Sequence, residues 1–164
     1  RVMAITTKTI AILAIASAIG FGSLVVLSEI YLSVGFGLLD GRLSGYDVEA
    51  VNKYLALLSS ENRQFYIGSF RVLDTIVPPL LATTFAAIIW TLGSTLWRTT
   101  VVFPLIYVIA DLRENALVGQ ILQATTLDAE TVSSASDMTQ LKWLFTVLSF
   151  AVVLWLWRQG RTQA

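Results

Sequence analysis

The chain contains four long stretches in which apolar residues follow one another with few charges. They cover about residues 9–32, 65–97, 101–123 and 139–158. A helix needs roughly 20 apolar residues to cross a bilayer core of about 30 Å. Each stretch reaches that length, so the pattern predicts four membrane-spanning helices.

The first stretch also fits a second interpretation, a cleaved signal peptide. It follows Arg1 and Lys8 and is rich in small residues. However, its uncharged run from Thr9 to Ser28 is long for the core of a signal peptide. We therefore expect a spanning helix here and keep cleavage as the alternative.

The segment between the first two stretches, Asp40 to Asn62, has a different pattern. Its apolar residues recur at spacings of three and four, at Val48, Val51, Leu55 and Leu58. With Ser44 as the expected N-cap, this predicts a short amphipathic helix over about 46–59. We place it at the membrane interface, with a solvated loop helix as the alternative. A second polar segment, 124–137, is expected to be a loop.

Composition agrees with a membrane protein. Hydrophobic residues make up 55% of the 164 residues and charged residues 13%, against roughly 25% charged in a soluble domain. The mean hydropathy is +0.72. The expected fold is all-α: an integral membrane four-helix bundle with an interfacial amphipathic helix between the first and second spans. We expect residues 1–164 to form a single membrane domain.

Charge and residue types exclude several functions. There are 11 basic and 11 acidic residues, so no general positive charge is present to hold nucleic acid. The chain has neither histidine nor cysteine, which excludes the usual ligands of zinc, copper, haem iron and iron–sulfur clusters. We therefore expect no cofactor, no metal site and no catalytic residue.

The distribution of charge predicts the orientation. With four spans both termini lie on one side, and that side collects basic residues and no acid: Arg1, Lys8, Arg98, Arg158 and Arg161. By the positive-inside rule this side is cytoplasmic, or the matrix or stromal side in an organelle. The expected protein is multi-pass with both termini on that side.

Eight polar residues within or at the ends of the predicted spans form the candidate site. They are Glu29, Arg71, Asp74, Asp111, Arg113, Glu114, Asn115 and Lys142. A charge at bilayer depth costs about 2.5–3.5 kcal/mol on insertion scales, so each needs a partner or a water-lined cavity. Asp111, Glu114 and Asn115 share one helix face by their spacing, whereas Arg113 faces about 200° away from Asp111.

Two interpretations of this cluster remain open. In the first, the four acids are balanced by Arg71, Arg113 and Lys142 in a buried network that sets helix packing. In the second, one acid in excess of the bases helps to form a polar cavity that opens outward and binds a proton, an ion or a lipid head group. We expect the first, with the outer half of the bundle closed and dry.

Short motifs occur in a fixed order around this cluster. They are Gly45-Tyr46-Asp47, Leu73-Asp74 with Pro78, Asp111-Leu-Arg-Glu114-Asn115, and Leu141-Lys142-Trp143. Over residues 45–143 the chain resembles an uncharacterised family of four-span membrane proteins with GYD, LD…P, D-x-x-E-N and L-K motifs. The resemblance implies the topology and the importance of the cluster, and names no reaction. Arg113 departs from the apolar residue usual in that family.

Three hypotheses of function follow. The first is a non-catalytic membrane subunit or scaffold of a larger assembly. Its partners would be membrane lipids and either other membrane subunits or further copies of the chain. The alternative is a small carrier of protons, ions or lipids that uses the intramembrane carboxyl groups. The third is an intramembrane enzyme with Asp111 and Glu114 as acid and base, which lacks any supporting motif.

Overall fold

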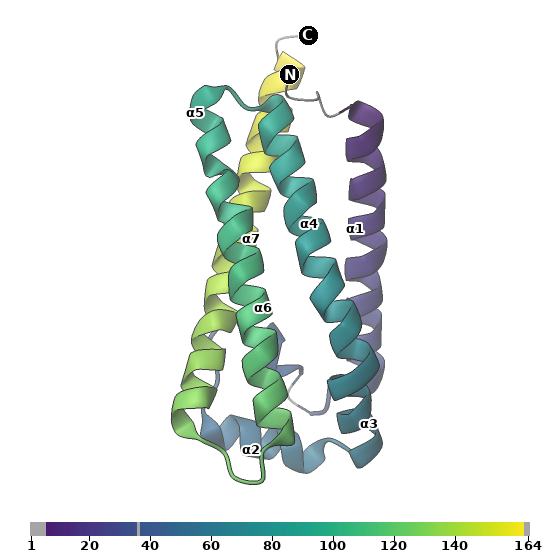
Figure 1. The fold of residues 1–164 in the computed structure, drawn as a ribbon, viewed down its shortest axis with the longest axis vertical. Coiled ribbons are helices and arrows are strands. Elements are labelled where there is room, and N and C mark those ends of the chain that lie inside the picture. The colour runs from purple at the N-terminus through teal and green to yellow at the C-terminus, as the bar shows by residue number, and fades with distance from the viewer. Residues whose placement is uncertain (1–5, 36, 163–164) are drawn as a thin grey trace.

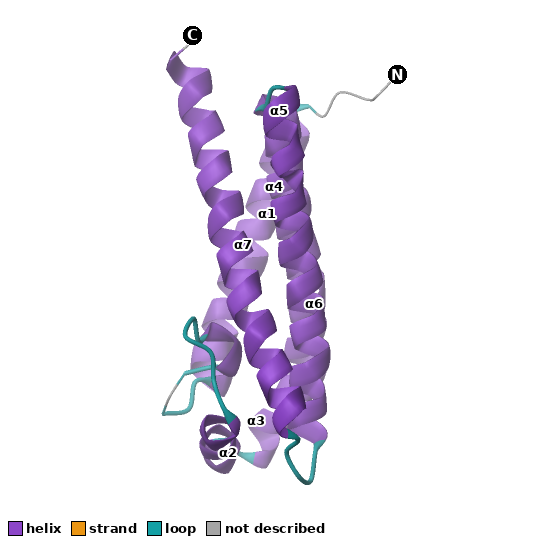
Figure 2. Cartoon of the chain, turned by 90° about the vertical axis from the view of Figure 1, so that its left-hand side faces the viewer, coloured by secondary structure: helices purple, strands orange, loops and turns teal. Residues whose placement is uncertain are grey.

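Four long helices lie side by side in the computed structural model, which describes residues 6–35 and 37–162 (Figure 1). They are α1 (Thr7–Leu27), α4 (Arg71–Leu92), α6 (Val102–Gln123) and α7 (Ala129–Thr162). No strand occurs in these residues (Figure 2). Arg1 lies outside the described residues, and the side chain of Arg161 is likewise not described.

Short helices join the long ones. They are η1 (Ser28–Leu32), η2 (Leu39–Gly41), α2 (Val48–Leu57), α3 (Ser60–Phe65), η3 (Tyr66–Phe70), α5 (Thr95–Arg98) and η4 (Thr99–Val101). The start of α1, the end of α7 and α5 lie at one end of the bundle, and α2 and α3 lie at the other (Figure 1). Successive long helices therefore run in opposite directions.

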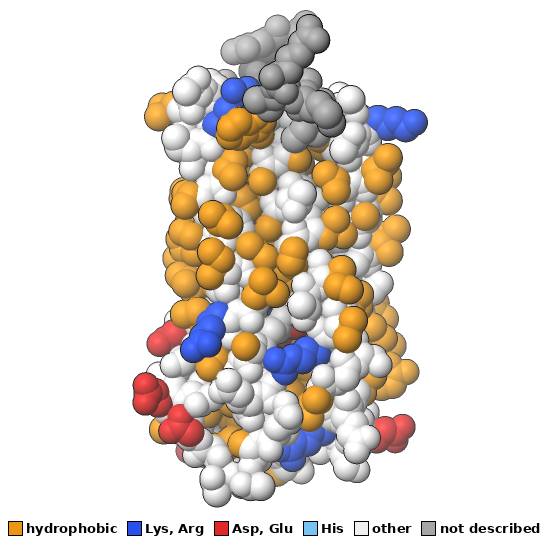
Figure 3. Space-filling model, in the orientation of Figure 1, with side chains coloured by type: hydrophobic (Ala, Val, Ile, Leu, Met, Phe, Trp, Pro, Cys, Tyr) orange, Lys and Arg blue, Asp and Glu red, His pale blue; other side chains and the backbone are white. Residues whose placement is uncertain are grey.

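Three stretches of helix are long and apolar enough to cross a membrane: Thr7–Leu32, Ser60–Leu92 and Ala129–Gln159. The described residues contain helices and no strand, so the all-α prediction is confirmed for them. Helix α6 has 22 residues but carries Asp111, Arg113 and Glu114, so composition alone does not mark it as a span. Apolar side chains cover much of the visible face, and acidic ones gather toward the α2 and α3 end (Figure 3).

Two predicted boundaries are wrong. The second stretch does not stay helical to residue 97, because α4 ends at Leu92 and Gly93 takes an extended backbone with ψ 140°. The predicted loop 124–137 is mostly helix, since α7 begins at Ala129. Asp128 caps α7 by accepting a 2.8 Å hydrogen bond from the Thr131 amide, and the Thr131 hydrogen bonds hold the pKa of Asp128 below its usual range.

The predicted amphipathic helix corresponds to α2, but its N-cap is Asp47 and not Ser44. The Asp47 carboxylate accepts a 2.8 Å hydrogen bond from the Ala50 amide. Tyr54 is fully buried, and its hydroxyl donates to the Leu32 carbonyl at 3.1 Å. Burial raises the pKa of Tyr54 above its usual range. This contact fixes α2 against the end of the first helical stretch.

The long helices pack in sequence order, α1 on α4, α4 on α6 and α6 on α7. Within the apolar part, the Ser17 and Thr84 hydroxyls share a buried 2.8 Å hydrogen bond that joins α1 to α4. Over the described residues α1 and α7 make little direct contact. The strap, which we define as the described residues 33–35 and 37–47, lies between η1 and α2 in the chain and reaches α7 through η2.

Candidate functional site

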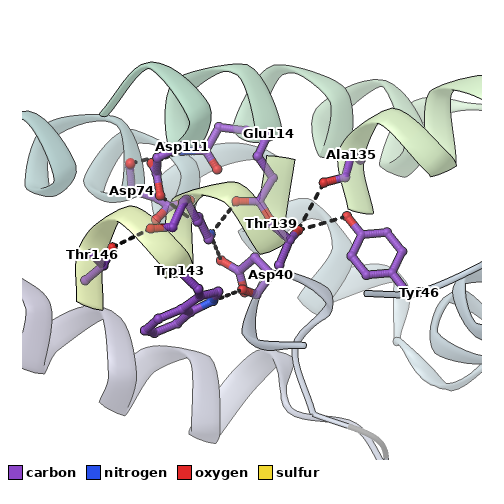
Figure 4. A network of polar contacts seen from close by, with 11 residues as sticks. Asp40, Tyr46, Asp74, Asp111, Glu114, Ala135, Thr139, Trp143 and Thr146 are labelled. Atoms are coloured by element: carbon purple, nitrogen blue, oxygen red, sulfur yellow. Dashed lines mark hydrogen bonds and ion pairs between the residues drawn. The ribbon is translucent and has the colours of Figure 1, made fainter. Parts of the chain in front are cut away.

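Lys142 on α7 lies at the centre of the polar cluster. The side chain is buried, and its ammonium nitrogen lies 3.5 Å from an Asp111 carboxylate oxygen and 3.6 Å from one of Asp40 (Figure 4). It also forms an ion pair with Glu114, which is fully buried. A single ammonium thus joins α6, α7 and the strap. Without it, three carboxylates would lie together in a medium of low dielectric constant.

A threonine one turn before the lysine extends the cluster. The Thr139 hydroxyl donates to the Glu114 carboxylate and lies 3.5 Å from the Tyr46 hydroxyl. Burial raises the pKa of Tyr46 well above its usual range, so its phenol stays neutral. Both Glu114 oxygens therefore have partners on α7, one in Thr139 and one in Lys142.

The Gly45-Tyr46-Asp47 motif has a structural explanation at each position. Gly45 has a φ of +79°, and a Cβ there would collide with Ser136 and Gln140 of α7. The Tyr46 amide donates a 2.8 Å hydrogen bond to the Ser136 hydroxyl, and Asp47 caps α2. The motif therefore packs the strap against α7 beside Thr139.

Asp40 is held to α7 in two ways. Its carboxylate pairs with Lys142, and its backbone carbonyl accepts a 2.8 Å hydrogen bond from the Trp143 indole N–H. From the sequence pattern, Asp40 is predicted only to lie in a loop, outside the cluster. Nothing in its local pattern distinguishes it from the other loop acids.

Pro78 explains why Asn115 lies beside Asp74. A proline has no amide hydrogen, so in α4 the Asp74 carbonyl, four residues earlier, loses its usual helical donor. The Asn115 side-chain amide replaces this donor at 3.0 Å, and the same group lies 3.3 Å from an Asp111 oxygen. Helix α4 thus stays helical through the proline, and the carbonyl that the proline leaves without a donor accepts a hydrogen bond from α6.

A cavity of about 330 Å³ lies next to this cluster. Side chains of all four long helices and of the strap surround it. Its polar lining includes Asp40, Arg42, Asp74, Asp111 and Lys142. Its lining on α1 includes Phe21 and Val25, which are 41% and 45% exposed on the molecular surface. Expecting a closed outer half was therefore wrong at this place.

Three of the predicted site residues lie apart from the ion pairs. The Arg71 guanidinium packs against Gly119 of α6, where a Cβ would otherwise lie, and it forms no ion pair with a described residue. Arg113 is exposed and points out of the bundle. Glu29, in η1, is exposed and contributes to the cavity lining. The predicted balance, in which Arg71 and Arg113 neutralise the acids, is therefore wrong for the described residues.

No group of three or more acidic, histidine or cysteine residues in the described ranges is placed to hold a metal ion.

Two π-helical turns border the cavity. They are η1, with Ser28 and Glu29, and η3, with Phe70. Such turns occur frequently at functional sites.

No protein-family model, curated protein or solved structure matches the chain.

Proposed function

We propose that α6 also crosses the membrane, which makes the chain a four-span protein. Its 22 residues run along α4 and α7 and span about 33 Å at 1.5 Å per residue. Asp111 and Glu114 face inward, where Lys142 pairs with both. Arg113 faces outward and can extend its long side chain toward a membrane surface.

Single cysteines test this topology. Ser94 lies between α4 and α6, and Thr126 lies between α6 and α7; both are exposed. If α6 spans, a membrane-impermeant thiol reagent applied to intact cells labels Thr126→Cys and not Ser94→Cys, since the basic residues Lys8, Arg98 and Arg158 mark the inner side. Ser59→Cys, beside α3, is labelled as well. Equal labelling of the Ser94 and Thr126 variants would contradict the proposal.

The function best supported is binding of a membrane-resident amphiphile at the cavity. One observation supports it above all: the cavity combines buried charged side chains with an apolar lining on α1, where α1 and α7 make little contact. Its volume is at the lower end of the usual 300–1,000 Å³ range for ligand sites. That volume suits a polar head group, whose chains would remain in the bilayer. This favours the carrier hypothesis over the scaffold hypothesis.

A matched pair of substitutions on α1 tests the proposal. Val25 lines the cavity, whereas Val26 is 55% exposed and does not line it. We expect Val25→Trp to fill the entrance and to reduce lipid retained through gentle purification by about tenfold, as measured by native mass spectrometry. Val26→Trp should retain the wild-type amount.

Two results would contradict binding at this cavity. One is equal retention of lipid by the two tryptophan variants. The other is a wild-type protein that retains no lipid and migrates only with other chains, which would restore the hypothesis of a membrane subunit. Thermal unfolding of both variants shows whether each remains folded.

A further inference from the structure

We infer that the amphiphile carries an ammonium group, which binds against Asp74. This inference rests on the proposed function and names the class of ligand for the same cavity. It follows from the charges that line the cavity and from the position of Asp74 among them.

The polar lining contains more carboxylates than cations. Glu29, Asp40, Asp74 and Asp111 line the cavity, against Arg42 and Lys142. Glu114 does not line the cavity, but its ion pair with Lys142 neutralises part of the positive charge of that lysine. The lining therefore has an excess of negative charge, and a ligand of the opposite charge is favoured there over an anion.

Asp74 differs from the other buried acids of this lining, because it forms no ion pair with a described residue; Glu29 forms none either but is exposed. The ion pairs of Lys142 go to Asp40, Asp111 and Glu114, and no described cation lies within 4.0 Å of the Asp74 carboxylate. Asp74 is only 6% exposed, yet it lines the cavity. Arg71, one turn earlier on α4, is directed to Gly119. The Asp74 carboxylate thus lines the cavity without an ion pair to a described residue, and Lys142 acts on it only from beyond ion-pair distance.

Aromatic side chains in the same cavity lining favour a cation as well. Phe70 and Tyr107 line the cavity from η3 and α6, and Trp143 lines it from α7. An ammonium group can interact with the face of an aromatic ring while it donates hydrogen bonds to a carboxylate. The exposed apolar residues of α1, such as Phe21 and Val25, provide a surface for the acyl chains.

Phosphatidylethanolamine and phosphatidylglycerol provide a matched pair of probes. Both have a phosphate and two acyl chains, but only the first has an ammonium group. We would reconstitute the full chain in nanodiscs with an equimolar mixture and measure the lipid retained by native mass spectrometry. The wild type should enrich phosphatidylethanolamine by about tenfold, the ratio expected for a charged hydrogen-bonding partner.

Substitutions of aspartate then assign the preference. Asp74→Asn should remove the enrichment while lipid is still retained, and Asp74→Glu should keep it. Asp137→Asn, on the exposed face of α7 and outside the cavity lining, is the matched control and should behave as wild type.

Each other outcome has a distinct meaning. If the wild type and Asp74→Asn retain the same lipid ratio, the inference fails, because the Asp74 carboxylate then does not set the lipid preference. If the wild type and Val25→Trp retain equal amounts of lipid, the proposed function itself fails. Displacement of the lipid by millimolar free ethanolamine would show that the ligand is a soluble amine, which also contradicts the inference.

Discussion

The two halves of the bundle are held together in different ways. In the half near α2 and α3, buried charges accompany the larger apolar core and join helices, as Lys142 does with Asp111 and Glu114. In the half near the ends of the chain, apolar residues such as Ile89 and Leu156 pack together. Ser17 and Thr84 provide a hydrogen bond between neutral groups in the apolar part of the α1 and α4 contact.

The difference shows how an opening can exist in one half. Apolar packing has no directional requirement, so side chains can fill the space between helices. The charged half instead requires particular charged atoms at fixed distances. Asp40 provides one of these groups, and the Trp143 indole and Lys142 hold it in place. A cavity remains where α1 and α7 make little direct contact, and the strap forms part of its lining.

Removal of the central cation should have the largest effect. Lys142→Ala leaves Asp40, Asp111 and Glu114 without their ammonium partner, which should lower the free energy of unfolding by about 3–5 kcal/mol. Unfolding in detergent, followed by circular dichroism, measures this loss. Lys53→Ala is the matched control, because Lys53 pairs only with Glu49 on the exposed face of α2. Equal stability of the two variants would show that the charged half does not depend on Lys142.

A double-mutant cycle tests the replacement of a backbone donor by a side chain. Asn115→Leu leaves the Asp74 carbonyl without a donor and should lower the free energy of unfolding by about 1–3 kcal/mol. Pro78→Ala restores the amide that this carbonyl lacks, so Asn115→Leu should cost about 1 kcal/mol less in that background. Additive effects in the cycle would show that the two residues act independently. The same unfolding measurement serves all four proteins.

The smallest effect is expected in the apolar half. Ser17→Ala removes one side of a neutral hydrogen bond, while the Thr84 hydroxyl still donates to the Leu80 carbonyl at 2.9 Å. The loss in free energy of unfolding should be about 0.6 kcal/mol, typical of such bonds between membrane helices. A loss as large as that of Lys142→Ala would remove the contrast between the halves. Ser23→Ala is the control, because Ser23 bonds only within α1, to the Ile19 carbonyl.

Much of the fold follows from local sequence pattern. Long apolar runs predicted the helices around Thr7–Leu32 and Ser60–Leu92, and spacing placed Asp111, Glu114 and Asn115 on the face that is buried. Proximity of Lys142 to that face was also predicted. The helical period relates residues three or four positions apart, so it can be read from the local sequence. The free-energy cost of an isolated charge in the bilayer applies to every spanning helix, so it indicates which charges need partners.

Tertiary structure decided which charges meet. Asp40 enters the cluster because the strap folds back on α7, and Arg71 is absent because Gly119 leaves space for its guanidinium elsewhere. Neither contact is encoded in a local pattern, since each joins residues more than forty positions apart. The sequence by itself determined helices, their apolar surfaces and a set of buried charges. Only the packing of separate segments decided the ion pairs and left a cavity, because both depend on distances between atoms that the chain brings together from different elements.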